Sequence, residues 1–198
     1  KILGNAVNLP ALEDRVTLFN GLHQGIARRA DPVTWSAEFI AFLGQISNKL
    51  SDLEVSEIWA LAKLGRGTLT APERLKDAWA RATNTSLADS DRIQAISLLA
   101  HAESPAPLVS LLDARETLDV QTAALGILRE QRETSIGAAL VAAWRSYGPE
   151  TRPGILKILL DRRNFHAPLI SALEAGTLSV GELHLDLEQR RRLLRGSS

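Results

Sequence analysis

Histidines are the residues of this 198-residue chain best suited to acid–base or metal chemistry, and there are four: His23, His101, His166 and His184. No two of them stand at the i, i+4 spacing that places two ligands on one face of a helix. His184 has one ligand-like neighbour, Asp186, and two ligands do not hold a metal ion. The chain has no cysteine, which excludes disulfides, thiolate metal sites and a cysteine nucleophile. We therefore expect no metal site and no cofactor in this chain.

Other catalytic patterns are also missing from the sequence. Neither a Gly-x-Ser-x-Gly nucleophile motif nor a phosphate-binding glycine loop occurs. The segment 65–68, Gly-Arg-Gly-Thr, follows no strand, and we interpret it as the end of a helix and a turn. The carboxylate pairs Glu13/Asp14 and Asp89/Asp91 lie at predicted helix starts, where they cap the helix and interact with its dipole. The sequence therefore predicts no catalytic residue, and we expect that the chain is not an enzyme.

Arginines on polar helix faces are the remaining candidates for binding. The concave surface of a helical repeat protein is its usual binding surface, and three arginines could line one: Arg81, Arg115 and Arg145. The alternative interpretation is a solvated face of mixed charge. The chain has 23 basic and 23 acidic residues, balanced in each half, so no overall field attracts nucleic acid or an anionic membrane. The expected partner is a protein, with no nucleic acid and no membrane insertion.

The elements that position these residues are predicted to be helices. Alanine and leucine dominate, and alternating β-branched runs are absent. Three segments have the spacing of a capping box, in which a hydroxyl and a carboxylate three residues apart satisfy the first amides of a helix: 51–54, 70–73 and 179–182. Prolines indicate further helix starts at Pro105 and Pro149, and glycines indicate helix ends at Gly148, Gly176 and Gly196.

Hydrophobic periodicity separates two kinds of helix. The segment 134–147 has one apolar stripe that includes Trp144, and Trp79 lies on a similar stripe, which predicts that both indoles are in the core. The segments 90–102 and 155–160 are apolar on two sides, so each must be covered on both sides. Trp35 is expected to pack at a helix start, and Trp59 is compatible with either a core or a groove.

A repeat of about 30 residues organises these helices. Residues 107–114 match residues 168–175, 61 positions later, and we distinguish three units, 89–117, 118–148 and 149–177, after weaker pairs between Pro10 and Ala82. Two short helices cannot bury their own apolar faces, so stacked neighbours must cover them. The prediction is one all-α domain over residues 1–198, a right-handed HEAT-like α-α superhelix of about five to six antiparallel helix pairs. Residues 82–89 are the best candidate hinge, although we interpret them as a long loop.

The C-terminal third carries a resemblance to a known family. Residues 168–178 (Pro-Leu-Ile-Ser-Ala-Leu-Glu-Ala-Gly-Thr-Leu), Glu182-Leu183 and 189–194 resemble the end of the HEAT-like region in large planctomycete-type membrane-bound dehydrogenases with a haem-binding cytochrome c domain. Residues 18–26 resemble an upstream helix of that region. In that family a β-propeller precedes the solenoid and the cytochrome follows it. Haem attachment needs a Cys-x-x-Cys-His motif, so no haem site is carried over to this chain.

The resemblance implies a non-catalytic scaffold that spaces or docks the redox domains of a larger exported or periplasmic protein. The chain has no targeting signal of its own, and the absence of methionine favours a fragment. The alternative is a free-standing adaptor solenoid that binds a protein or peptide in its concave groove. A HEAT-like DNA glycosylase is less favoured, because it would need a concentrated basic groove.

Overall fold

The computed structural model describes residues 12–28, 33–66, 69, 71–104 and 106–195. The regular elements within these ranges are helices, which confirms the all-α class. The chain divides into two compact units, 1–103 and 104–198. The arrangement of a single solenoid domain over 1–198 stays a prediction.

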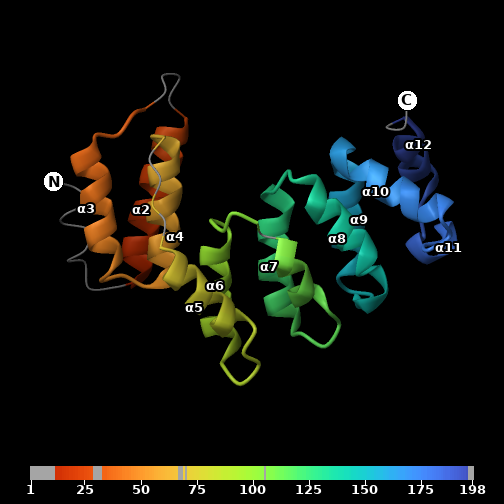
Figure 1. Cartoon of the computed structure of the whole chain (residues 1–198), viewed down its shortest axis with the longest axis horizontal. Helices are drawn as coiled ribbons and strands as arrows, with labels where there is room; N and C mark the ends of the chain where they lie inside the picture. Colours follow the sequence, from red (N-terminus) through yellow and green to blue (C-terminus); the bar gives the residue numbers. More distant parts are fainter. Residues whose placement is uncertain (1–11, 29–32, 67–68, 70, 105, 196–198) are drawn as a thin grey trace. The chain divides into compact units, whose positions relative to one another are not determined.

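The first unit is organised around helix α4. Its helices are α2 (Leu12–Ala27), α3 (Ala37–Ser47), α4 (Asp52–Leu64), α5 (Pro72–Ala82) and α6 (Asp89–Leu99). Helix α4 packs against α2, α3 and α6, and α5 packs against α6 (Figure 1). The apolar residues Val55, Ile58 and Leu61 of α4 are almost fully buried. Helix α4 is therefore the element that holds this unit's core together.

The second unit contains shorter helices. They are η1 (Ala106–Leu112), α7 (Leu118–Glu130), α8 (Thr134–Ala142), η2 (Trp144–Ser146), α9 (Arg152–Asp161), α10 (Arg163–Glu174), α11 (Val180–Leu183) and α12 (Leu187–Arg195). Helix η1 packs on α7 and α8, and α8 packs on α10. Helix α9 contacts α7, α8, α10 and α12. Its five apolar residues between positions 155 and 160 are all buried. The predicted two-sided burial of this helix is confirmed.

Two of the three predicted capping boxes are present. Ser51 and Glu54 cap α4 reciprocally, with the Ser51 N–H donating to the Glu54 carboxylate over 2.9 Å. Ser179 and Glu182 cap α11 in the same way. The box predicted at 70–73 depends on Thr70, which lies outside the described residues. Helix α5 starts at Pro72 after Ala71, whose side chain makes no capping hydrogen bond, and a proline in the first turn needs no amide acceptor.

Two predicted helix boundaries also differ from the structure. The predicted helix over 134–147 ends at Ala142, and η2 follows it, because Ser146 and Tyr147 pair their backbones with Ala114 and Asp113. Pro149 does not start α9, because it lies in a turn. In this turn the carbonyl oxygen of Gly148 accepts a hydrogen bond from the amide of Thr151. Gly176 ends α10 at φ +67°, as predicted. Pro105 and Gly196 lie outside the described residues.

Alternate helices pack on one another in each unit. Helix α2 packs on α4 and α4 on α6, while η1 packs on α8 and α8 on α10. The predicted units 118–148 and 149–177 correspond to the pairs α7–α8 and α9–α10. The predicted unit 89–117 contains α6 and η1, so it spans the division between the two compact units.

Candidate functional site

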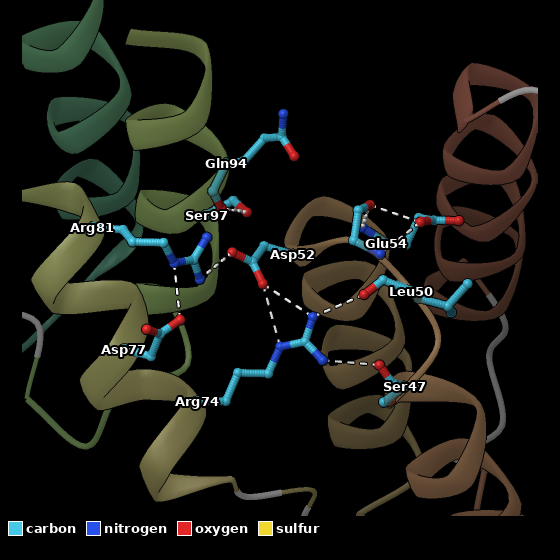
Figure 2. Close-up of polar contacts among 10 residues, drawn as sticks. Ser47, Leu50, Asp52, Glu54, Arg74, Asp77, Arg81, Gln94 and Ser97 are labelled. Atoms are coloured by element: carbon cyan, nitrogen blue, oxygen red, sulfur yellow. Dashed lines mark hydrogen bonds and ion pairs between the residues drawn. The ribbon is translucent and has the colours of Figure 1, made fainter. Parts of the chain in front are cut away.

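A carboxylate held by two arginines is the centre of the most connected polar cluster in the first unit (Figure 2). Asp52 opens α4, and its side chain is 8% exposed. Arg74 donates to Oδ1 from Nε over 3.2 Å and from Nη2 over 3.0 Å. The Nη2 atom of Arg81 lies 2.5 Å from Oδ2. Both arginines come from α5, two helical turns apart, so that they share one face.

Arg74 also joins two neighbouring segments. Its Nη1 donates to the carbonyl oxygen of Ser47 and its Nη2 to that of Leu50, both over 2.9 Å. These carbonyls lie at the end of α3 and in the turn before α4, and that of Ser47 also accepts the amide of Leu50 over 3.4 Å. The guanidinium fork therefore ties α3, α4 and α5 together.

Arg81, the first candidate binding residue, is engaged inside this cluster. Its Nε donates to Asp77 Oδ2 over 2.9 Å, in addition to its contact with Asp52. Burial lowers the pKa of Arg81, but hydrogen bonding and charge from Asp52 and Asp77 raise it above its ordinary value. A partner's anion would have to replace these two carboxylates, so the cluster acts first as an internal connection.

The other two candidates lie in the second unit, Arg115 in the turn after η1 and Arg145 in η2. Arg115 is 89% exposed, and its Nε and Nη2 donate to the carboxylate of Asp113 over 2.8 and 3.2 Å. Arg145 lies in η2, not on a long helix face, and donates to Glu182 over 3.1 Å. The amide of Ala114 donates to the carbonyl of Ser146, which brings the two segments together. Arg81 belongs to the first unit and is not grouped with them.

These ion pairs also change the acidity of their carboxyls. The hydrogen bond from Arg115 lowers the pKa of Asp113 below its usual range. The backbone amide of Ser179 and then Arg145 lower the pKa of Glu182. Each candidate arginine thus has a carboxylate partner within its own unit, which agrees with the interpretation of a mixed-charge surface. Binding by these residues stays a prediction.

Ser56 and His101 form a contact that the sequence did not reveal, because the two residues are 45 positions apart. The Ser56 Oγ lies 3.0 Å from His101 Nε2 and 2.9 Å from the carbonyl oxygen of Ser97. A carbonyl only accepts, so the single hydroxyl proton goes to Ser97 and His101 Nε2 must carry its own proton. In this arrangement His101 donates a hydrogen bond to Ser56. It therefore does not act as the base that a serine nucleophile would require.

The environment of His101 is apolar. The ring packs edge-on against buried Trp59 at a centroid distance of 5.6 Å. Burial, followed by the charge of Lys63, lowers the pKa of His101 to about 4. The ring is therefore neutral at pH 7, and it links α4 to the turn that follows α6. Trp59, which the sequence left open, belongs to the core.

The remaining histidines are separate. His23 Nδ1 lies 3.6 Å from a carboxylate oxygen of Glu57, and buried His166 contacts the carbonyl of Leu160. His184 follows α11 with a left-handed φ of 48°. Within the described residues, no three histidine, aspartate or glutamate side chains gather to hold a metal ion.

The other tryptophans are placed largely as predicted. Trp144 is 2% exposed, while Trp79 is half-buried on its stripe. Trp35 precedes α3, and its indole N–H donates to the carbonyl of Leu61 over 3.0 Å. Its ring lies so close to Gly65 that a Cβ there would be 2.0 Å away. The glycine after α4 is thus required by the indole packed against it.

No family model, curated protein or solved structure matches this chain. In the part of the chain that the structure describes, no helix combines the length and the apolar character needed to cross a membrane. The resemblance to the HEAT-like region therefore rests on the residues already named.

Proposed function

We propose that this chain is a non-catalytic scaffold, a HEAT-like α-solenoid that spaces or docks other protein domains. The observation that carries the proposal is the packing of alternate helices, α2 on α4 on α6 in one unit and η1 on α8 on α10 in the other. Stacked helix pairs produce this pattern, because each pair is covered by the next. Extended surfaces built in this way commonly bind proteins.

The polar side chains join helices to one another, which supports a structural role over a catalytic one. The Asp52 cluster joins α3, α4 and α5, and the contact between Ser56 and His101 joins α4 to the turn after α6. The candidate arginines are each paired with an acidic side chain. Such pairing favours a neutral surface for protein contacts and disfavours a basic groove for DNA.

Excision of a repeat tests the solenoid. Deleting 118–148 removes the pair α7–α8, and in a solenoid α9 then takes the place of α7. We expect the shortened chain to keep its helix content per residue and a cooperative unfolding transition, measured by circular dichroism. Deleting 118–133 is the control, because it removes one helix and interrupts the alternation. If both deletions unfold the chain equally, the repeat is refuted.

The finer proposal, that the chain spaces redox domains, is tested by sequencing the gene beyond the codon for Ser198. We expect the reading frame after Ser198 to encode a Cys-x-x-Cys-His motif within a cytochrome-like segment. A frame that continues without such a motif overturns the dehydrogenase context, whereas it leaves the solenoid untouched.

One observation favours the adaptor alternative. Among the described residues, three large apolar side chains are exposed, and they belong to the second unit: Leu118, Val180 and Leu187. Exposed apolar groups can provide contacts for a partner protein. A pull-down distinguishes the adaptor from the spacer, with a variant that carries serine at all three positions as the control. Capture of a protein encoded elsewhere, lost in the variant, supports the adaptor, and capture of only the flanking domains supports the spacer.

A further inference from the structure

A pocket of about 400 Å³ lies in the second unit, between η2, α9 and the segment of α11 and α12. Its apolar walls include Pro149, Pro153, Leu156 and Leu183, and Trp144 and Arg152 also line it. The rest of the lining is polar or charged: Glu182, His184, Asp186 and Gln189. Pockets of this size are typical of small-molecule sites.

Two hydrogen-bond donors at this pocket have no acceptor. Trp144 Nε1 and Arg152 Nε are both buried, and neither makes a hydrogen bond within the described part of the chain. Trp144 is 2% exposed, and the Arg152 guanidinium lies 5.8 Å above the centre of its ring. Buried donors ordinarily have hydrogen-bond partners. Two neighbouring side chains whose donors lack one therefore indicate that a bound ligand supplies the acceptor.

The charges indicate which acceptor fits. No carboxylate among the described residues pairs with Arg152, in contrast to Arg145 beside it. Two acidic residues at the pocket already have partners: Glu182 with Arg145, and Asp186 with the amide of Gln189. An anionic ligand therefore places its charge at Arg152, away from Asp186.

We propose that this pocket binds a small organic acid, with the carboxylate between Arg152 and the Trp144 indole and the hydrocarbon part against the apolar walls. A guanidinium matches a carboxylate geometrically through parallel N–H donors. Both unpaired nitrogens are screened from solvent, so the Arg152 side chain must move for the ligand to reach them, and the carboxylate then lies at the N–H edge of the indole, in the plane of the ring. The site adds ligand binding to the proposed scaffold and does not depend on it.

The test is a titration of the full chain, labelled with ¹⁵N, with 4-methylpentanoate. We expect a saturable shift of the Trp144 indole N–H resonance, assigned by loss of the peak in Trp144→Phe. Arg152→Gln should weaken binding at least about tenfold, since it removes the charge. Arg163→Gln, a cation on α10 outside the pocket, is the control and should bind as the unchanged chain does. Circular dichroism establishes that each variant is folded.

Three kinds of result would overturn the proposal. The first is no saturable indole shift at millimolar acid, and the second is equal weakening in Arg152→Gln and Arg163→Gln. The third comes from matched probes: 4-methylpentanamide binding as tightly as the acid would show that the charge is not recognised, and inorganic phosphate binding as tightly would show a general anion site.

Discussion

Acidification should destabilise the first unit through His101. The ring has a pKa of about 4 in the folded chain, because it is buried and lies near Lys63. In the unfolded chain its pKa is about 6.5. Between these two values the unfolded chain binds a proton that the folded chain rejects. The free energy of unfolding is therefore unaffected above about pH 6.5 and falls as the pH is lowered towards 4.

The magnitude follows from the two pKa values. Each pKa unit corresponds to 1.36 kcal/mol, so His101 alone should remove about 3 kcal/mol of stability between pH 6.5 and 4. A domain is stable by about 5–15 kcal/mol in total, so the loss is easily measured. Urea unfolding followed by tryptophan fluorescence is suitable, because Trp59 is in contact with the ring.

The variant His101→Gln isolates this effect. Glutamine keeps a donor for Ser56 but does not titrate, so the variant should lose about 3 kcal/mol less than the unchanged chain over this pH range. Carboxyls such as Asp113 and Glu182 titrate equally in both proteins and cancel in the comparison. An NMR titration of the His101 ring with a midpoint at or above 6.5, or identical pH profiles for the two proteins, would refute the reasoning.

Four further substitutions test the packing, each by urea denaturation at pH 7. Asp52→Asn should lower the free energy of unfolding by about 2–3 kcal/mol, since two arginines lose the negative charge that they share. Asp77→Asn, at an exposed position, should lower it by less than about 1 kcal/mol. Equal losses in the two variants would contradict the assigned roles. Gly137→Ala should cost about 1–3 kcal/mol, because its Cβ would lie 2.7 Å from buried Phe165. Gly126→Ala, with open space in α7, should instead stabilise by about 0.5–1 kcal/mol, and a loss there would contradict the described helix.

Sequence reasoning succeeded where the determining chemistry is local. The capping boxes of α4 and α11 are complete within four residues each, and the two-sided burial of α9 is determined by its own apolar pattern. It failed where a distant segment decides. The helix after Thr134 stops early because residues 113 and 114 pair with 146 and 147.

The candidate site shows the same limit. The polar helix face of Arg81 predicts a binding residue, but Asp52, which engages Arg81, lies on another helix. The contact between Ser56 and His101 joins residues 45 positions apart, and the Trp144–Arg152 pocket needs α11 and α12 to be folded against α9. None of these neighbours follows from periodicity, because periodicity identifies a buried face without identifying what covers it.

The spacing of Arg74 and Arg81 on α5 limits how this helix can change in length. Seven residues are almost two full turns, which is why both side chains reach one carboxylate. One residue inserted between them would rotate Arg81 by about 100° away from Asp52, and four would restore its direction but move it about 6 Å along the axis. Insertions before Arg74 or after Arg81 leave this spacing intact. Length variation among descendants of this chain should therefore accumulate at the ends of α5 and avoid its middle.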